Sequence, residues 1–214
     1  MTEKNGIANK SETFNKQDVE VMSKTSLFNG FFSMVKYTFR HRLFAGGWSD
    51  TIEREMFERG HAAALLPYDP ILDKVVLIEQ IRVGALEDRS PWQFEIIAGM
   101  IDKGESAEEV VRRESMEEAG LTVISTEKIT CYFPSSGACS ERLDLFVGLI
   151  DSRQAGGIHG LEEEGEDIKV HIVDRELAYS MVNSGKIENS ASIIALQWLE
   201  LNNSRLRSLH SNDE

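Results

Sequence analysis

The sequence predicts an α+β fold, with a mixed β-sheet sandwiched between helices as in α/β proteins and an N-terminal antiparallel β-sheet appendage. Three observations support this prediction. Short runs rich in β-branched residues fill the middle of the chain, one capped amphipathic helix interrupts them, and two alternating runs precede them. At 214 residues the chain is long enough for one mixed core domain with such an appendage.

The N-terminal part of the chain predicts a small separate sheet. The first dozen residues are polar and aperiodic, which is typical of a mobile terminus. Phe31–Arg40 and Ile52–Phe57 then alternate between apolar and polar residues, on either side of the turn-forming pair Gly46 and Gly47. We therefore expect two strands before the main apolar pattern begins.

The rest of the chain predicts the central sheet and its helices. One helix is expected at Ser106–Ala119, because Ser106 and Glu109 form a capping box and Gly120 supplies the stop. The glycine-rich and acidic segment Asp151–Asp167 is aperiodic and is expected to be a long mobile loop. The expected strands are His61–Leu66, Lys74–Ile81, Phe94–Ile101, Leu121–Ser125, Glu127–Phe133, Leu143–Ile150 and Ile168–Val173, and two further helices are expected at Asp174–Ser184 and Ser190–Leu201.

Composition excludes several classes of protein. The formal net charge of −13 argues against binding to a nucleic-acid backbone, which requires a surplus of Lys and Arg. No apolar run is long enough to span a bilayer, and the first 25 residues have no apolar signal core, so we expect no membrane association and a cytoplasmic location. Cys131 and Cys139 lack metal-ligand spacing partners and are interpreted as structural or incidental.

The expected helix at Ser106–Ala119 carries acids on the wrong face for a solvated helix. Val110 and Val111 mark its apolar stripe, and at about 100° per residue Glu114, Glu117 and Glu118 fall on or beside that stripe. Buried carboxylates must be compensated by a cation. Arg113 can reach Glu117, but one guanidinium cannot neutralise three acids, so divalent cations are the expected remainder. Hard oxygen ligands favour Mg²⁺, with Mn²⁺ as a substitute.

The spacing of glycines and charges around this helix resembles the Nudix box. The matching positions are Gly99, Glu105, Arg113, Glu114, Glu117, Glu118, Gly120 and Leu121. The motif is specific, and the expected context of strand, loop and helix is present. One departure is Ser115, where the box usually has an aliphatic residue; we expect it at the rim of the apolar stripe, with a small packing difference and no loss of chemistry.

Beyond the box, the chain resembles the bacterial ADP-ribose diphosphatase (ADP-ribose pyrophosphatase) subfamily from about residue 14 to residue 201. The segments that carry the resemblance are RGHAAALLPYDP, VVLIEQIRVGA, PWQFEIIAGMI, GIHGLEEEGEDIKVHIV and IIALQW. The resemblance implies the Nudix fold and about two or three Mg²⁺ ions per site. It places the metals on the carbonyl oxygen of Ala98 and on Glu114, Glu118 and Glu166, and it assigns proton abstraction to Glu164. Taken alone, the loop acids have another interpretation as a solvated surface turn, and Glu162 and Glu163 are close enough to be confused with the base.

The resemblance also implies substrate contacts and a homodimer with a swapped N-terminal sheet. One subunit contributes Arg82, Met100, Ser135, Ser136, Gly137 and Glu141, and its partner contributes Phe31, Phe32, Arg54, Glu55 and Arg59. The residues themselves agree in part, since Arg82 ends a strand and suits a diphosphate clamp, and an aromatic pair can stack a purine. The alternatives are ordinary core packing for the two phenylalanines and surface ion pairs for Arg54 and Arg59. The subfamily usually has proline at Ser136, a departure that bears on substrate choice.

These observations predict a Nudix hydrolase that converts ADP-ribose to AMP and ribose 5-phosphate, with a role in nucleotide metabolism. Its expected organisation is a mobile terminus at 1–13, the appendage used in dimerisation at 14–58, the catalytic domain at 59–207 and a tail at 208–214. The catalytic residues are expected to be Arg113, Glu114, Glu117, Glu118 and Glu164. Two alternatives remain: another nucleotide sugar, a dinucleoside polyphosphate or a nucleoside triphosphate as substrate, or a nucleotide sensor without catalysis. An activity panel separates the substrates, and a broken box would mark the sensor.

Overall fold

The computed structural model describes residues 14–210, apart from the side chains at positions 164, 209 and 210, and divides them into two compact units. The first unit ends at Arg59 and also includes Ser135–Ser140. The second unit consists of Gly60–Pro134 and the chain from Glu141 onward. The expected mobile terminus at 1–13 and the last four residues of the expected tail lie outside the described residues.

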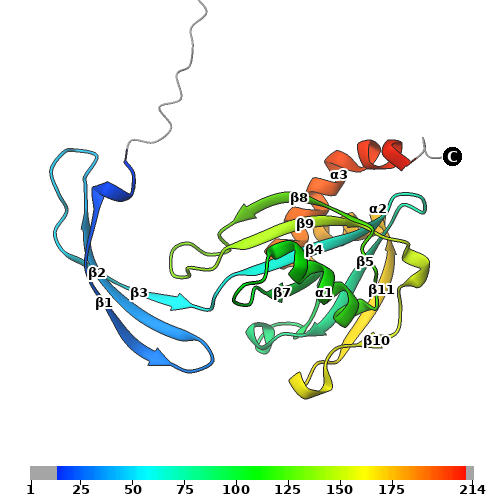
Figure 1. Ribbon diagram of the computed structural model, residues 1–214, viewed down its shortest axis with the longest axis horizontal. Helices are drawn as coiled ribbons and strands as arrows, with labels where there is room; N and C mark the ends of the chain where they lie inside the picture. Colours follow the sequence, from blue (N-terminus) through cyan, green and yellow to red (C-terminus); the bar gives the residue numbers. More distant parts are fainter. Residues whose placement is uncertain (1–13, 211–214) are drawn as a thin grey trace, which may run out of the picture. The chain divides into compact units, whose positions relative to one another are not determined.

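The first unit is a three-stranded antiparallel sheet in the order β1-β2-β3 (Figure 1). A short 3-10 turn, η1 (Lys16–Asp18), precedes β1 (Val19–Asn29), β2 (Ser33–His41) and β3 (Ile52–Glu58). The sequence predicted only the second and third strands. β1 escaped the prediction because its residues, VEVMSKTSLFN, do not keep a strict alternation, and its pairing with β2 shifts register twice.

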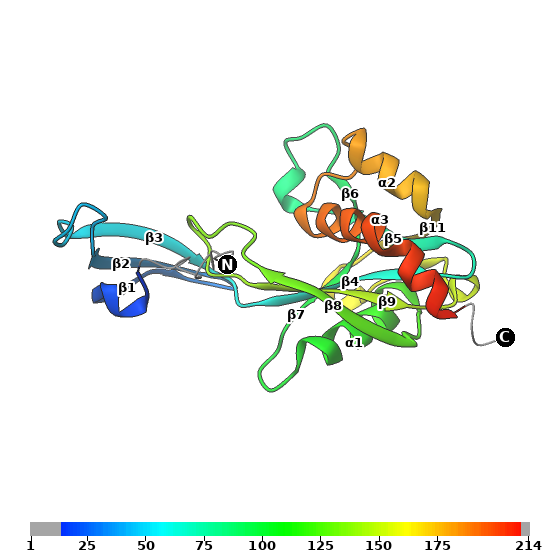
Figure 2. The same ribbon diagram turned by 90° about the horizontal axis from the view of Figure 1, so that it is seen from above.

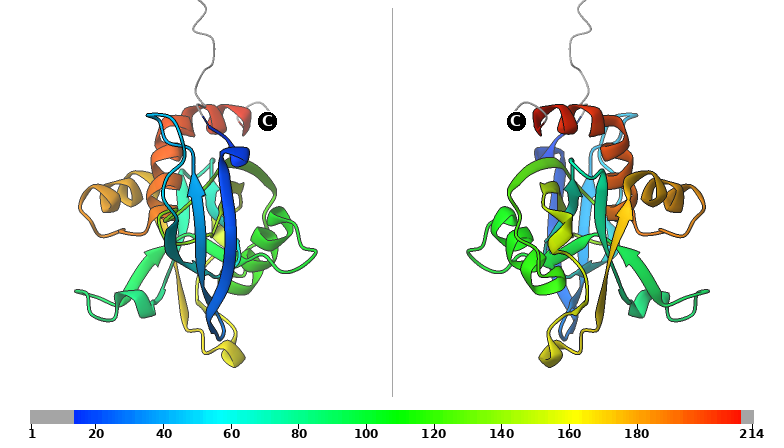
Figure 3. Two further views of the ribbon diagram at one scale, coloured as in Figure 1. Left: turned by 90° about the vertical axis from the view of Figure 1, so that its left-hand side faces the viewer. Right: turned by 90° about the vertical axis from the view of Figure 1, so that its right-hand side faces the viewer.

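This sheet has almost no core within its own unit. All eleven residues of β1 are exposed, and Val35 is the single buried hydrophobic residue among the described residues up to Arg59. The strands lie side by side in Figure 3, and β3 is joined to Ser135–Ser140 through two backbone hydrogen bonds of Phe57, to Ala138 and Ser140. A three-stranded sheet needs a hydrophobic face packed against something to be stable. Apolar residues of β1 such as Val21, Met22 and Phe28 therefore lack cover within the unit.

The second unit is built on one mixed sheet with the strand order β10-β11-β5-β4-β9-β8. Two short strands extend it, β6 on β5 and β7 on β4, and only the pairing of β4 with β9 is parallel. The strands are β4 (Ala62–Asp69), β5 (Lys74–Ile81), β6 (Trp92–Glu95), β7 (Ile97–Met100), β8 (Ser125–Tyr132), β9 (Leu143–Leu149), β10 (Ile158–His159) and β11 (Ile168–Asp174). The expected mixed sheet is thereby confirmed.

Helices cover both faces of this sheet, as Figure 2 shows, with α1 (Ala107–Ala119) on one face and α2 (Arg175–Asn183) and α3 (Ser190–His210) on the other. Because side chains alternate along a strand, β4 serves both cores. Leu66 and Tyr68 pack with α2 and α3, whereas Ala63 and Leu65 pack with α1. No helix within residues 14–210 is long and apolar enough to cross a membrane.

The caps of α1 form as the sequence predicts. The Ser106 side chain accepts a hydrogen bond from the Glu109 N–H, the Glu109 carboxylate accepts one from the Ser106 N–H, and Gly120 ends the helix at φ +63°. The buried face carries Val110, Val111 and Glu118. These features fix both ends of the helix that carries the acids.

Other boundaries differ from those expected. The predicted strand Phe94–Ile101 is two strands, β6 and β7, because the chain changes partner from β5 to β4 at Ile96. Of the predicted strand Leu121–Ser125, only Ser125 lies in a strand, as the first residue of β8. The segment Asp151–Asp167 contains η3 (Ser152–Gln154), η4 (Glu162–Glu164) and β10, which pairs with β11, so it is not one structureless loop. Helix α3 continues to His210, beyond the predicted end at Leu201.

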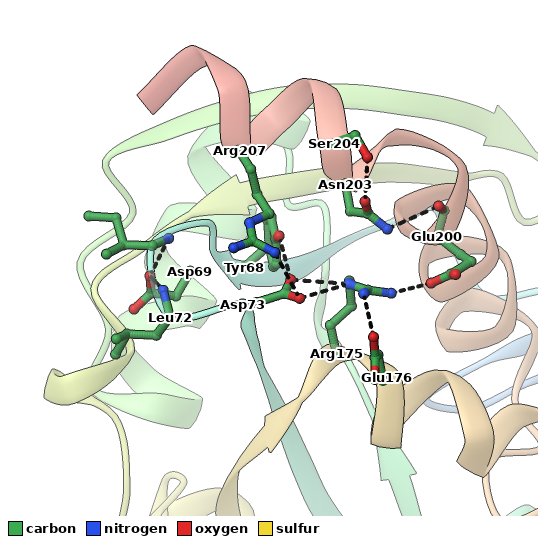
Figure 4. A network of polar contacts seen from close by, with 11 residues as sticks. Tyr68, Asp69, Leu72, Asp73, Arg175, Glu176, Glu200, Asn203, Ser204 and Arg207 are labelled. Carbon is green, nitrogen blue, oxygen red and sulfur yellow. Dashed lines mark hydrogen bonds and ion pairs between the residues drawn. The ribbon is translucent and has the colours of Figure 1, made fainter. Parts of the chain in front are cut away.

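A polar network joins α2 and α3 to the turn between β4 and β5 (Figure 4). Asp73, at φ +55°, accepts hydrogen bonds from the Tyr68 hydroxyl at 2.7 Å and from Arg175 Nε at 3.0 Å. Arg175 also pairs with Glu200 of α3, and Arg207 reaches Asp73 at 3.3 Å. Arg175 is buried, so these partners satisfy a charge that burial alone would destabilise.

Candidate active site

Glu118 is the most buried acid of helix α1, with 3% of its surface exposed. Its Oε2 accepts a hydrogen bond from the Ala98 N–H of β7 at 3.2 Å. Burial raises the pKa of Glu118 to about 8; the hydrogen bond from Ala98 and the charge of Arg82 oppose this rise, and the charges of Glu114 and Glu166 add to it. The predicted position of this acid on the buried face is confirmed.

Glu114 lies one turn before Glu118 and packs against the backbone of β7. A Cβ atom built on Gly99 would come within 1.8 Å of Glu114 Oε1, so the carboxylate occupies the space that any side chain at Gly99 would need. Burial raises the pKa of Glu114, and the nearby Arg113 guanidinium opposes the rise. Gly99 is therefore required at this position to let the acid approach the strand.

Arg113 holds three acids in place. Its guanidinium contacts Glu105 at 3.0 Å, Glu114 at 2.7 Å and Glu117 at 2.9 Å. The hydrogen bonds that Arg113 donates to Glu105 raise the pKa of the guanidinium; desolvation opposes this rise, and Glu114 and Glu117 add to it. The expected contact with Glu117 is present. Glu118 receives none of this compensation from Arg113, because the guanidinium bonds to the other three acids.

Arg82 follows β5 and is anchored by Glu95 of β6. Its Nε and Nη2 atoms donate to Glu95 Oε2 at 3.0 Å and 2.7 Å. Burial would lower the pKa of Arg82, but the pair with Glu95 and the charges of Glu118 and Glu166 raise it. Sequence reasoning missed Glu95, because only the pairing of β5 with β6 brings it beside Arg82.

The acidic loop places Glu166 two residues before β11. Glu166 Oε2 accepts a hydrogen bond from the Leu161 N–H at 3.0 Å, and its N–H donates to the Leu161 carbonyl. Gly160, at φ +104°, leaves room for this turn, since a Cβ there would come within 2.7 Å of Glu166 Cβ. Glu162 and Glu163 are exposed on η4. The backbone of Glu164 belongs to η4, but its side chain lies outside the described part of the chain.

The carboxylates of Glu114, Glu118 and Glu166 suit a divalent cation. Glu114, Glu118 and Glu166 perturb one another electrostatically, and only oxygen atoms are offered. Within the described residues, no three Asp, Glu, His or Cys side chains already stand together as a metal cage. Instead each acid bonds to a protein donor: Arg113, the Ala98 N–H or the Leu161 N–H. The chemistry of the donor set therefore fits a hard cation, and these bonds are the ones that cation binding would replace.

The other predicted contact residues fall into both units. In the second unit Met100 is half-buried at the end of β7, and Glu141 is buried. In the first unit Phe31 is 91% exposed, and its ring centroid lies 4.7 Å from that of Phe32. Arg59 stacks on Phe32 at 5.5 Å. Phe31 is therefore not part of a hydrophobic core, which was the alternative interpretation of this residue. The remaining predicted contacts of this unit, all exposed, are Arg54, Glu55, Ser135, Ser136 and Gly137.

Ser115, the one departure within the box, is fully buried rather than at the rim of the apolar stripe. Its hydroxyl donates to the Val111 carbonyl at 2.6 Å, four residues earlier in the same helix. A serine that bonds in this way satisfies its own polar group. The box helix therefore accommodates the substitution without an unpaired hydroxyl.

Comparisons with known proteins identify the family of this chain. The NUDIX domain model matches residues 58–196. ADP-ribose pyrophosphatase of Escherichia coli K12 is 54% identical over 196 residues, covering 91% of this chain and 94% of the relative, and that of Haemophilus influenzae is 48% identical over 198 residues, covering 91% of each. GDP-mannose pyrophosphatase of Pectobacterium atrosepticum is 31% identical over 185 residues, covering 84% of this chain and 92% of the relative. The chain therefore belongs to the NUDIX domain family.

Proposed function

We propose that this protein hydrolyses the diphosphate bond of ADP-ribose and releases AMP and ribose 5-phosphate. The observation that carries the proposal is that Glu114 and Glu118 lie against Gly99 and Ala98 of β7, with Arg82 and Glu166 close enough to affect the pKa of Glu118. The similarity of the chain to ADP-ribose pyrophosphatases covers both units. The relatives that act on GDP-mannose share a smaller fraction of residues, 31% against 54%. We therefore propose ADP-ribose, rather than GDP-mannose, as the substrate.

Mg²⁺, with Mn²⁺ as a substitute, is the proposed cofactor. The Ala98 carbonyl with Glu114, Glu118 and Glu166 would hold about two or three ions. When bound, these ions supply positive charge that offsets the negative charge of the diphosphate. The need is large, because the chain has a formal net charge of −13 and a diphosphate carries two further negative charges at about neutral pH.

The side chains of the protein position the acids, bind the diphosphate and take up the proton. Arg113 fixes Glu114 and Glu117 on one face of α1. Arg82, held by hydrogen bonds to both carboxylate oxygens of Glu95, offers a fixed guanidinium to a diphosphate oxygen. We assign to Glu164 the role of base: it takes a proton from water, the water oxygen bonds to phosphorus, and the bridging P–O bond breaks. The leaving phosphate keeps the electron pair of that bond.

We further propose that the protein is a homodimer in which the sheets β1-β2-β3 are exchanged and complete the substrate site. Support comes from the exposed residues of β1, since an uncovered sheet needs an apolar partner. The aromatic pair Phe31 and Phe32, with Arg59 stacked on Phe32, suits a purine base. Phe31, Phe32, Arg54, Glu55 and Arg59 are the residues that the partner would supply.

Two more proposals concern the domain organisation and the location of the protein. The domain organisation is proposed as an appendage at 14–58 and a catalytic domain at 59–207. The cytoplasm is proposed as the location, because Cys131 forms no disulfide, as is usual for a cysteine in a reducing compartment.

Product analysis tests the function. Purified protein is incubated with Mg²⁺ and, in parallel, ADP-ribose, GDP-mannose, a diadenosine polyphosphate or a nucleoside triphosphate, and the products are separated by ion-exchange chromatography. AMP and ribose 5-phosphate from ADP-ribose, at the highest kcat/KM of the panel and lost with a chelator, are the expected result. Faster turnover of GDP-mannose would favour a nucleotide-sugar hydrolase. Binding of ADP-ribose without any product would identify a sensor and overturn the proposal.

A further inference from the structure

Gln80 carries a buried hydrogen-bond donor that the described residues leave unused. The side chain is 6% exposed, and no described atom accepts a hydrogen bond from its amide nitrogen, Nε2. Buried donors without a partner are rare in folded proteins, because burial removes the hydrogen bonds that water would make. An unpaired donor inside a protein therefore calls for a specific explanation.

The alternation of β5 places this donor on the face of the sheet that α1 covers. Val76 and Ile78 belong to the hydrophobic cluster that packs with α1, and Gln80 follows Ile78 on the same face. The next residue on that face is Arg82, whose backbone is still extended and whose N–H continues the pairing toward β6. Gln80 thus lies between the apolar core and Arg82, whose pKa is raised by the charges of Glu118 and Glu166.

The register of β5 with β11 identifies the nearest acid of the site. Lys169 pairs with Glu79 in this antiparallel ladder. Extended beyond this last pair with the same register, the ladder would bring Ile168 opposite Gln80 and Glu166, two residues before β11, opposite Arg82, all on one face. Glu166 is then the diagonal neighbour of Gln80, a position within reach of a long side chain. The cross-strand neighbour on the other side, Gln93 of β6, already uses its amide to donate to the Ser90 carbonyl at 2.9 Å.

We propose that Gln80 is a positioning residue for the divalent-cation centre, with its amide donating to the Glu166 carboxylate when a cation is bound. The proposal rests on the proposed function, because it requires that Glu166 be a ligand. In the cation-free chain Glu166 bonds to the Leu161 N–H. A cation that draws Glu166 toward Glu118 and Glu114 would replace that bond, and the unused donor of Gln80 would then hold the second oxygen of the ligand. Donors of this kind orient a ligand and increase metal affinity.

The test measures metal binding without substrate and stability without metal. Mn²⁺ is titrated into wild-type protein, Gln80→Met and Gln93→Met, with free Mn²⁺ followed by electron paramagnetic resonance. Methionine preserves volume but removes the amide. We expect Gln80→Met to bind Mn²⁺ about 10 to 100 times more weakly. Its metal-free melting temperature should equal or exceed that of wild type, because an unpaired buried donor is gone. Gln93→Met should bind Mn²⁺ as wild type does.

The outcomes separate this inference from the proposed function. Equal Mn²⁺ affinity in wild type and Gln80→Met overturns the inference and leaves the metal centre intact. A lower metal-free melting temperature for Gln80→Met than for Gln93→Met assigns Gln80 a structural role and also overturns it. If wild type binds no Mn²⁺, the proposed centre itself fails. Should Gln80→Met not fold, Gln80→Asn keeps a shorter amide and takes its place, with weaker Mn²⁺ binding again the expected result.

Discussion

Gly99 and Glu114 occupy one another's space: a Cβ atom on Gly99 would lie 1.8 Å from Glu114 Oε1, well inside van der Waals contact. The glycine is thus required by the acid on the neighbouring helix rather than by its own backbone angles. This close approach brings α1 against β7, and with it Glu118 against the Ala98 N–H. The position of Glu114, a proposed catalytic acid, therefore depends on the absence of a side chain at Gly99.

Gly99→Ala should displace Glu114 and lower kcat by about tenfold or more, because a ligand moved by about 1 Å loses its productive geometry. Overpacking should also lower stability by about 1–3 kcal/mol. Steady-state kinetics and urea unfolding measure the two effects. Gly84→Ala is the matched control, since a Cβ there meets nothing within 4 Å. Wild-type turnover in Gly99→Ala would show that Glu114 need not occupy this position.

Glu118→Gln should lower turnover by more than about 100-fold, because it removes one charged ligand from the proposed metal centre. The metal-free protein should fold and be no less stable, since a carboxyl group at 3% exposure is replaced by a neutral group of the same shape. Circular dichroism and product release at saturating Mg²⁺ provide the measurements. Near wild-type rates would contradict the assignment of Glu118.

Glu164→Gln should slow the chemical step by roughly 10²–10⁴-fold with little change in substrate binding, the usual result of removing a general base. Glu166→Gln should instead raise the Mg²⁺ concentration needed for activity, because more metal can compensate for a lost ligand but not for a lost base. Titration of Mg²⁺ against both variants distinguishes them. Recovery of Glu164→Gln at high Mg²⁺, without recovery of Glu166→Gln, would reverse the two roles.

Asp69→Asn should destabilise the second unit by about 1–3 kcal/mol. Asp69 is buried and accepts hydrogen bonds from the N–H groups of Ile71, Leu72 and Ser152 and from the Ser152 hydroxyl. An amide would direct N–H groups at these donors. Urea unfolding at pH 7 measures the difference, with the exposed residue Asp88, changed to Asn, as the control.

The contribution of Asp69 should also depend on pH. Burial would raise the pKa of Asp69, but the hydrogen bonds from Leu72, Ser152 and Ile71 outweigh it and hold the pKa below its ordinary value of 3.8. The unfolded chain then binds the proton more tightly than the folded chain. The stability that the ionised group contributes is present above about pH 4 and is lost as the pH falls through the folded pKa. The difference between wild type and Asp69→Asn should therefore be constant near pH 7 and shrink in more acidic solution.

Negative charges placed on the exposed apolar residues of β1 should disrupt the proposed dimer. Val21→Asp combined with Leu27→Asp puts two carboxylates on exposed apolar positions of that strand, and light scattering should then report a monomer with little activity. Leu201→Asp, on the exposed face of α3, is the control and should leave both unchanged.

A composite site also predicts complementation. Arg54→Ala and Glu118→Gln should each be nearly inactive as homodimers, and subunit exchange between them should restore part of the activity. The reason is that one of the two sites in each mixed dimer would carry neither substitution. A monomer with full activity, or a mixture without any recovery, would contradict the exchanged arrangement.

The sequence by itself determined the box helix and the type of chemistry. Ser106, Glu109 and Gly120 act on their own turns of backbone, and the placement of Glu118 on the buried face follows from a period of 3.6 residues. Both depend on residues a few positions apart, so they can be derived before any tertiary contact is known. The same local spacing indicated the family, which the match of the NUDIX domain model over residues 58–196 then showed.

Tertiary structure decided which of these groups meet. β1 was missed because its pairing with β2, and not its pattern, makes it a strand, and the run Phe94–Ile101 divides because Ile96 lies where the chain passes from β5 to β4. Glu95 became the partner of Arg82, and Gln80 an unpaired donor on the face that α1 covers, through the same strand pairing. Strand pairing joins residues far apart in the chain, and its free energy depends on partners that no local window contains.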